Sequence, residues 1–241
     1  MIHINHLKKS YDSFTLECSL DIPKGVITGI IGMNGAGKST LFKSILGINP
    51  IDEGNIQIPD KQDIGVVLSE TGFSEFFTVS DIISILKCTY KHFDEDLFRS
   101  YCQRFDIPLD KKTRTFSTGM KAKLNMIIAL THHAKLLILD EPTAGLDVLT
   151  RDEILDILRD YMEQEDCTIL ISSHISSDLE SLCDDLYIID HGKIIMHEEM
   201  DTLLSLYGVL KVSKEDYKNL DKDYLLKVMK EPFGYSCLTN V

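Results

Sequence analysis

The sequence predicts an α/β fold in which helices cover both faces of a mostly parallel central sheet. Apolar, β-branched runs at 26–31, 136–139, 168–171 and 187–189 have the length and composition of strands that are buried on both sides. Apolar residues at helical spacing separate these runs, as expected where helices connect parallel strands. The first run ends in a glycine cluster followed by helical spacing, which indicates a strand, a loop and a helix in that order.

Two further segments depart from this alternation of strands and helices. Apolar and polar residues alternate across 2–22 until the turn residues at 23–25, which predicts an N-terminal subdomain of short antiparallel strands. Between about 80 and 115 the pattern changes to helices separated by charge-rich turns, and a further helix opens at Ser117. We therefore expect an inserted helical subdomain over about 80–133.

The remaining elements complete the expected organisation. Thr150 and Glu153 have the spacing of a capping box, which predicts the start of the helix after the second buried strand. We expect residues 1–205 to form the main domain and 206–241 a C-terminal extension. Alternation near 235–238 predicts a strand there, and the extension is either truncated or a small β element that helps two copies associate.

Charge and composition exclude several classes of protein. The chain has 241 residues, with 25 Lys and Arg against 38 Asp and Glu, a formal net charge of −13. An acidic protein repels a phosphate backbone, so we expect no nucleic-acid partner. There is no apolar run of 18 residues and no apolar stretch behind a basic N-terminus. The six cysteines form no CxxC pair, which favours a reducing cytosol and buried thiols.

The glycine cluster matches the phosphate-binding pattern GxxxxGK[ST], known as a P-loop, in the required context of strand, loop and helix. Glycines let backbone N–H groups surround a phosphate chain, Lys38 reaches the terminal phosphates, and the Ser39 hydroxyl is a suitable Mg²⁺ ligand. The start of the following helix adds positive potential. The sequence therefore predicts ATP and Mg²⁺ binding by Gly32, Met33, Asn34, Gly35, Ala36, Gly37, Lys38, Ser39 and Thr40.

Two carboxylates follow the second buried run, at the sheet edge where open α/β folds bind ligands. Asp140 is expected to belong to the Mg²⁺ shell. Glu141 is expected to polarise the attacking water beside the terminal phosphate.

Residues Phe116–Met120, upstream of these carboxylates, resemble the signature motif of ATP-binding cassette (ABC) ATPases, usually written LSGGQ. Other motifs of that family match in order. Tyr11 matches the aromatic residue that stacks on adenine, 144–147 resembles the D-loop, and His174 matches the switch histidine. The resemblance covers residues 1 to about 200.

The resemblance implies a head-to-tail dimer with two ATP molecules between facing subunits. In such a dimer Ser117 and Gly119 serve the partner's nucleotide, and Asp147 lies at the shared site. Ser117 also caps a helix whose N-terminus offers N–H groups to a phosphate. His174 would hydrogen bond the terminal phosphate and orient water. The other histidines, including the pair at 132–133, are expected to be solvated.

One family residue is missing from this sequence. The glutamine that usually contacts Mg²⁺ and water is replaced by Ser69, followed by Glu70. Our hypothesis is that Glu70 partly replaces it as an oxygen donor, at the cost of added negative charge beside the phosphates.

The resemblance also implies partners. The family pattern is that of an exporter of drugs or peptides, with the ATPase on the inner face of the cell membrane and integral membrane subunits as separate chains. The second ATPase subunit is either an identical copy or a related chain. Phe73, Phe76 and Phe77 either contact the membrane subunit or pack inside the helical subdomain.

Two alternative functions remain open on sequence grounds. One is a soluble ABC ATPase that acts on ribosomes or DNA, although the chain has a single cassette and no long coiled-coil insertion. The other is a slow, nucleotide-operated sensor or immunity module, which the missing glutamine keeps open.

Overall fold

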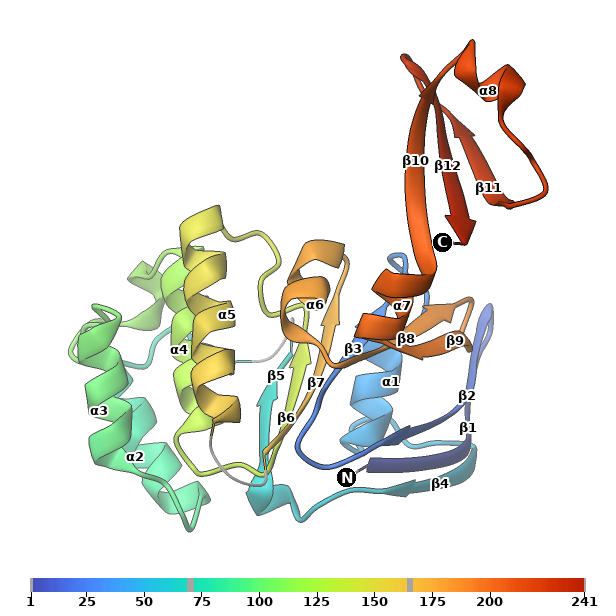
Figure 1. Cartoon of the computed structure of the whole chain (residues 1–241). Coiled ribbons are helices and arrows are strands. Elements are labelled where there is room, and N and C mark those ends of the chain that lie inside the picture. The colour runs from blue at the N-terminus through green and yellow to red at the C-terminus, as the bar shows by residue number, and fades with distance from the viewer. Residues whose placement is uncertain (1, 69–71, 164–166, 241) are drawn as a thin grey trace. The chain divides into compact units, whose positions relative to one another are not determined.

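The computed structural model describes residues 2–68, 72–163 and 167–240, and divides between His197 and Glu198 into two compact units. The first unit is built on a six-stranded sheet in the order β5-β6-β7-β3-β8-β9 (Figure 1). Each neighbouring pair from β5 to β8 is parallel, so the predicted α/β class with a mostly parallel sheet is confirmed. The strands are β3 (Ile27–Ile31), β5 (Ile64–Val67), β6 (Leu136–Asp140), β7 (Thr168–Ser173), β8 (Asp185–Asp190) and β9 (Lys193–Glu199).

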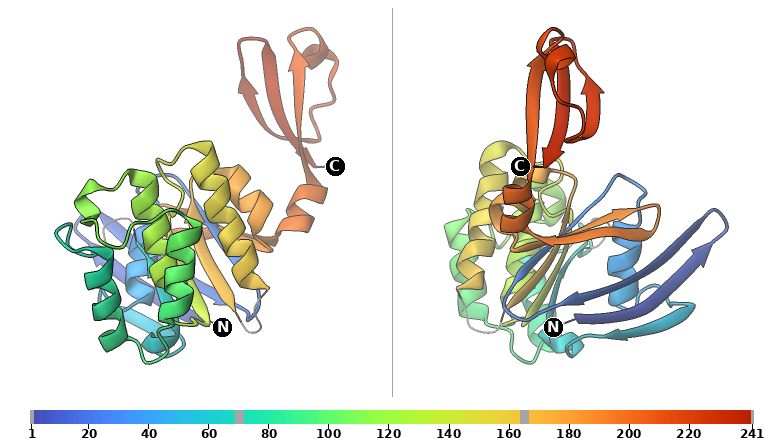
Figure 2. Two further views of the ribbon diagram at one scale, coloured as in Figure 1. Left: turned by 90° about the vertical axis from the view of Figure 1, so that its left-hand side faces the viewer. Right: turned by 45° about the vertical axis from the view of Figure 1, so that its right-hand side comes forward.

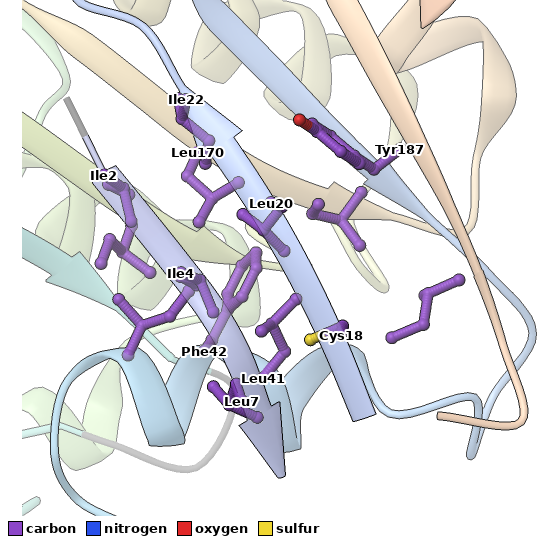
Figure 3. Packing of buried hydrophobic residues seen from close by; sticks show 14 of the residues in the cluster. Ile2, Ile4, Leu7, Cys18, Leu20, Ile22, Leu41, Phe42, Leu170 and Tyr187 are labelled. Atoms are coloured by element: carbon purple, nitrogen blue, oxygen red, sulfur yellow. The ribbon is translucent and has the colours of Figure 1, made fainter. Parts of the chain in front are cut away.

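A second sheet in the same unit is antiparallel and has the order β2-β1-β4. Its strands are β1 (Ile2–Tyr11), β2 (Phe14–Ile22) and β4 (Glu53–Gln57). Buried and less buried positions alternate along β2, as the period of two predicted. The buried side chains of β1 and β2 pack with Leu41 and Phe42 of α1 and with Leu170 of β7 (Figure 3). This core fixes the start of α1 relative to both sheets.

Helices cover both faces of the central sheet, with α1 on one side and α4, α5 and α6 on the other (Figures 1 and 2). Helices α2, α3 and α4 occupy the segment where the sequence predicts helices. Side-chain caps begin several helices, among them Thr78 for α2 and Asp94 for α3. The bounds are α1 (Lys38–Ile45), α2 (Val79–Thr89), α3 (Glu95–Arg104), α4 (Thr118–Leu130), α5 (Val148–Met162) and α6 (Ser176–Leu182), with short 3₁₀ turns at Lys61–Asp63 and Thr113–Thr115.

The predicted start of α5 is wrong. Asp147 is the N-cap, and its carboxylate accepts hydrogen bonds from the Thr150 backbone N (3.0 Å) and Oγ1 (2.9 Å). Thr150 therefore lies inside the first turn, and Glu153 pairs with Lys123 of α4 instead of closing a capping box. As the cap, Thr150 would accept from the Glu153 N–H group, whereas Asp147 accepts from the Thr150 N–H group one turn earlier, and the structure favours the aspartate.

The prediction that both histidines at 132–133 are solvated is wrong for the first of them. His132 is buried, its ring stacks on Tyr90 with centroids 4.0 Å apart, and its Nε2 lies 3.1 Å from the Ile64 carbonyl oxygen. His133 is exposed. His132 therefore links the end of α4 to β5 as a packed, hydrogen-bonded residue.

The second unit contains an antiparallel sheet in which β12 is the central strand, in the order β10-β12-β11. The strand expected near 235–238 is β12, and β10 and β11 are its pairing partners. The ring of Tyr217 stacks on Tyr235 with centroids 3.9 Å apart. Its elements are α7 (Met200–Leu206), β10 (Tyr207–Ser213), α8 (Asp216–Asn219), β11 (Leu225–Lys230) and β12 (Gly234–Asn240).

No helix within the described ranges combines the length and the apolar character that crossing a bilayer requires.

Candidate nucleotide site

The loop between β3 and α1 has the backbone geometry of a phosphate cradle. Gly35 and Gly37 lie in the left-handed region, with φ of 82° and 117°, which residues with a Cβ rarely adopt. A Cβ on Gly32 would overlap the carbonyl oxygen of Ile189. Gly37 is the N-cap of α1 and provides no side-chain cap, so the first N–H groups of the helix stay available.

A cavity of about 420 Å³ adjoins this loop. It brings together segments that are more than a hundred residues apart in the sequence. Most of the predicted loop residues line it, and so do both predicted catalytic residues. Its lining consists of Phe14, Met33, Asn34, Gly35, Gly37, Lys38, Ser39, Thr40, Glu141, Ala144 and His174.

Lys38 is the buried cation of this cavity. Its Nζ donates a hydrogen bond to the Gly32 carbonyl oxygen at 2.7 Å and lies 3.2 Å from Oε1 of Glu141. A buried ammonium group needs anionic or carbonyl oxygens around it. Lys38 is therefore placed to bind phosphate oxygens in the same cavity.

Glu141 is held by β7 and by the segment that follows it. Its backbone N donates to the Oγ of Ser172 at 3.0 Å, and its φ of 52° turns the chain sharply after β6. Its Oε2 accepts from the backbone N of His174 at 3.1 Å and lies 2.5 Å from Nδ1 of that ring. This contact leaves Nε2 of His174 to act on a ligand.

The ionisation of Glu141 follows from these contacts. Burial raises its pKa, but hydrogen bonds and positive charge from His174 and Lys38 outweigh burial, so the pKa lies below the ordinary value. Glu141 is therefore ionised at neutral pH and can accept a proton.

Asp140 has an open coordination position. The residue is 1% exposed, and its Oδ1 accepts a hydrogen bond from the Ser172 hydroxyl at 2.7 Å. Its buried Oδ2 has no hydrogen-bond partner among the described residues. Asp140 does not line the cavity that contains Ser39, but it directly precedes Glu141, which does. A buried, unpaired carboxylate oxygen at this position fits a divalent cation such as Mg²⁺, which takes few protein ligands and completes its shell with phosphate and water.

The sequence did not identify Phe14 as a site residue. Its ring lines the cavity, and its Cζ lies 2.9 Å from the position of a Cβ on Gly37. Tyr11, predicted to stack on adenine, lies with its ring centroid 6.4 Å from that of Phe14, and its hydroxyl accepts a hydrogen bond from Asn49 at 3.1 Å. The signal for Phe14 was its apolar side chain at the start of β2, a strand that borders the loop.

The signature segment lies at the start of α4. The Ser117 Oγ accepts from the backbone N of Met120 at 3.2 Å, so the predicted cap is present. A Cβ on Gly119 would lie 3.2 Å from the Thr150 side chain, so this glycine faces the start of α5. Ser117, Gly119 and Asp147 do not belong to the lining of the Lys38 cavity.

The remaining candidates are two polar residues and three phenylalanines. Ser69 and Glu70 fall outside the described residues. Phe76 is 67% exposed, with the Arg114 guanidinium 6.0 Å from its ring centroid, whereas Phe73 is partly buried and lines a cavity of about 410 Å³ beside α4. Phe77 is 37% exposed, so the three phenylalanines differ in exposure.

Comparisons with known proteins identify the family of this chain. The sequence model of the family described as ABC transporter matches residues 16–144. The chain belongs to the ABC transporter ATP-binding family, and it is an ATP-binding and ATP-hydrolysing subunit.

Two relatives and one solved structure illustrate the match. The chain is 30% identical over 231 residues to the ABC transporter ATP-binding protein YtrB of Bacillus subtilis (strain 168), covering 91% of this chain and 79% of the relative. It is 35% identical over 212 residues to the lantibiotic transport ATP-binding protein SrtF of Streptococcus pyogenes, covering 83% and 92%. A structure titled as the ATP binding subunit of an ABC transporter superposes with a TM-score of 0.76 at 24% identity, covering 84% of this chain and 91% of that one.

Proposed function

We propose that Glu141 is the general base of ATP hydrolysis in this subunit and that His174 orients the attacking water. The observation that carries the proposal is the contact series from Lys38 to Glu141 (3.2 Å) and from Glu141 to His174 (2.5 Å) inside one cavity beside the glycine loop. Glu141 accepts a proton from the attacking water while the water oxygen forms a bond to the terminal phosphorus. The bond between that phosphorus and the leaving ADP oxygen breaks.

The other residues of the cavity bind and orient. Lys38 and the N–H groups of the loop hold the phosphates, and Nε2 of His174 donates to the terminal phosphate. Ser39 and Asp140 would hold Mg²⁺, which neutralises charge on the phosphates. Tyr11 and Phe14 together offer an aromatic surface for the base.

The test of the general base is Glu141→Gln, which keeps the shape of the side chain and removes its charge. We expect ATP binding to persist while kcat falls at least about 100-fold, because general-base catalysis contributes about 100-fold to 10⁴-fold. The matched control is Glu17→Gln, an exposed glutamate on β2, which should hydrolyse at the normal rate. Normal turnover by Glu141→Gln would remove Glu141 from this role.

We propose further that the subunit works as a dimer, with an identical or related chain. Exposed apolar side chains on the loop and at the start of α5, namely Met33, Val148 and Leu149, support a contact face there. Ser117, Gly119 and Asp147 would reach the nucleotide of the facing subunit. Light scattering of Glu141→Gln with and without ATP and Mg²⁺ tests this, since a monomer in both conditions contradicts it.

We also propose that residues 1–205 handle the nucleotide, that 206–241 form an extension, and that the subunit drives an exporter of drugs or peptides from the inner face of the membrane. The name of the lantibiotic relative supports the exporter class, and the exposed Phe76 beside Arg114 supports a protein contact. Pull-down from a membrane extract with ATP-loaded Glu141→Gln protein, followed by mass spectrometry, tests the partner. An integral membrane protein is expected, whereas ribosomal or chromosomal components would favour a soluble ATPase.

A further inference from the structure

We propose that Asp178 of α6 is a positioning residue for ATP hydrolysis. Three segments carry the proposed functional residues: the turn that begins at Glu141, the first turn of α5, and the segment that runs from His174 into α6. The Asp178 carboxylate contacts the first two, and Asp178 itself lies on the third. The inference rests on the proposed roles of Glu141 and His174, and it assigns no contact between Asp178 and the nucleotide.

The contacts of Asp178 are buried and come from both sides. The residue is 1% exposed, although it lies in a short helix at the surface of the sheet. Its Oδ2 accepts a hydrogen bond from the Thr143 hydroxyl at 2.7 Å. Its Oδ1 pairs with the guanidinium of Arg151, which also donates to the Ser177 hydroxyl at 2.7 Å. Charge-assisted hydrogen bonds of this kind are short and directional.

Thr143 carries the first connection, to Glu141. It lies two residues after Glu141, in a tight turn where the Ala144 N donates to the Glu141 carbonyl oxygen at 3.1 Å and the Leu146 N donates to the Thr143 carbonyl oxygen at 3.3 Å. Glu141 itself has a left-handed backbone, which is costly unless the surroundings hold it. The bond from Thr143 to Asp178 fixes the middle of this turn.

Arg151 carries the second connection, to Asp147. Its backbone N donates to the Asp147 carbonyl oxygen at 3.0 Å, so the guanidinium holds the first turn of α5 against α6. Asp147 ends the turn that Glu141 begins. One carboxylate therefore holds the segment 141–147 within the turn, through Thr143, and at its end, through Arg151.

The third connection is to His174, through the main chain of α6. The Asp178 N donates to the Ile175 carbonyl oxygen at 3.2 Å, and the Ile175 N donates to the Ser173 hydroxyl at 3.0 Å. His174 lies between Ser173 and Ile175. The distance of 2.5 Å between Nδ1 of His174 and Oε2 of Glu141 therefore depends on the relative position of α6 and the turn that begins at Glu141.

A buried ion pair contributes little to stability, because the cost of desolvation offsets most of the attraction. Apolar residues of similar size often stabilise a fold equally well. It is effective at fixing geometry, because one planar carboxylate sets the direction of two donor groups, the Thr143 hydroxyl and the Arg151 guanidinium. Misplacement of a catalytic group by about 1 Å can cost about 100-fold in rate.

The test compares Thr143→Val with Thr143→Ser. Valine keeps the volume and removes the donor, whereas serine keeps the donor. We expect Thr143→Val to lower kcat about tenfold while KM for ATP changes less than about twofold, and Thr143→Ser to restore most of the rate. Asp178→Asn should behave like Thr143→Val. Asp160→Asn is the matched control, because Asp160 pairs with Arg104 at 3.2 Å in an exposed Arg–Asp bridge and should keep the normal rate.

A double-mutant cycle separates positioning from mere structural support. If Asp178 acts through the pair of Glu141 and His174, the tenfold loss from Thr143→Val should shrink to less than about threefold in a His174→Ala background. Equal losses in both backgrounds would overturn the inference. So would a Thr143→Val protein whose melting temperature falls while its kcat per folded molecule is unchanged.

Failure of the proposed function and failure of the inference about Asp178 give different experimental results. Normal hydrolysis by Glu141→Gln would remove the proposed base and the inference with it. A normal Thr143→Val rate beside an inactive Glu141→Gln would overturn the inference and leave the proposed function in place.

Discussion

The buried Lys38 forms an ion pair with Glu141. A lysine ammonium group at a buried position loses much of its hydration, and the Gly32 carbonyl oxygen and the Glu141 carboxylate supply the replacement oxygens. Phosphate oxygens are stronger partners because they carry more charge. Binding of a nucleotide would therefore compete directly with the ion pair and release Glu141 for its own chemistry.

Lys38→Ala should weaken nucleotide binding itself. We expect the Kd for ATP to rise at least about tenfold, since a hydrogen bond between charged groups contributes about 1.5–3 kcal/mol. Isothermal titration calorimetry measures this directly. Lys24→Ala, at an exposed lysine in the turn before β3, is the control and should bind normally. A Lys38→Ala protein that binds ATP as tightly as the parent contradicts this role.

His132 should make stability depend on pH. Burial lowers its pKa from the ordinary value of 6.5, and hydrogen bonding to two carbonyl oxygens only partly offsets this. The folded state therefore favours the neutral ring, and the unfolded state takes up a proton first as pH falls. The stabilisation is complete above pH 6.5 and is lost as pH falls below that value toward the folded pKa.

The measurement is the urea midpoint between pH 8 and pH 5.5 for the parent and for His132→Asn. We expect the parent to lose stability over this range and the variant to lose less, because asparagine has no proton to gain. His133→Asn, at the exposed neighbour, should follow the parent. Identical slopes for the parent and His132→Asn would show that the ring is not kept neutral.

The sequence could predict the residues of the site that follow motif spacing, and it missed those that depend on long-range packing. Lys38 was predicted because it completes the glycine-rich phosphate-binding pattern, and Glu141 and His174 were predicted because each directly follows a buried strand. Phe14 enters the cavity because β2 packs beside the start of α1, and its apolar side chain alone does not indicate that contact. Asp178 is buried through contacts with Arg151 and Thr143, which lie 27 and 35 positions earlier in the sequence. From the sequence alone, an acidic residue in a helix is expected to be exposed to solvent.

At the scale of elements, helix starts decide how the functional segments are aligned. Ser117 caps α4 and belongs to the signature segment, and Asp147 caps α5 and ends the segment 144–147. Each cap therefore also holds a motif segment at the start of its helix. The sequence located the Ser117 cap correctly, although Thr115 and Thr118 lie within two positions of it. At α5 two caps compete three residues apart, and propensity alone cannot choose between them.

The capping box of α2 is the cleanest case for a stability measurement. The Thr78 Oγ1 accepts from the Asp81 N at 3.1 Å, and the Asp81 carboxylate accepts from the Thr78 N at 2.8 Å. Thr78→Ala should lower the free energy of unfolding by about 1 kcal/mol. Thr78→Ser keeps the hydroxyl and should lose much less, as measured by urea denaturation. Equal losses for alanine and serine would contradict capping as the cause.

At the scale of the whole molecule, burial of the thiols reports the integrity of the fold. Cys88 is exposed on α2, whereas the other five cysteines are buried. Burial raises the pKa of Cys18 and of Cys102 to about 12, which suppresses the reactive thiolate.

We therefore expect Ellman's reagent to modify one thiol quickly in the native protein and six after denaturation. Cys88→Ser should remove the fast phase and leave a native protein that reacts slowly. Fast reaction of two or more thiols in the native parent would contradict the packing of the core.

The three-stranded sheet of the second unit has a consequence for solubility. Its outer strands, β10 and β11, leave backbone N–H and C=O groups without a strand partner among the described residues, and such edges recruit further strands. Exposed Lys211 lies on β10, and exposed Lys227 and Lys230 lie on β11. An approaching copy would bring like charges together along both edges. We therefore expect these lysines to oppose edge-to-edge association of copies, even though the same sheet exposes Val209 and Met229.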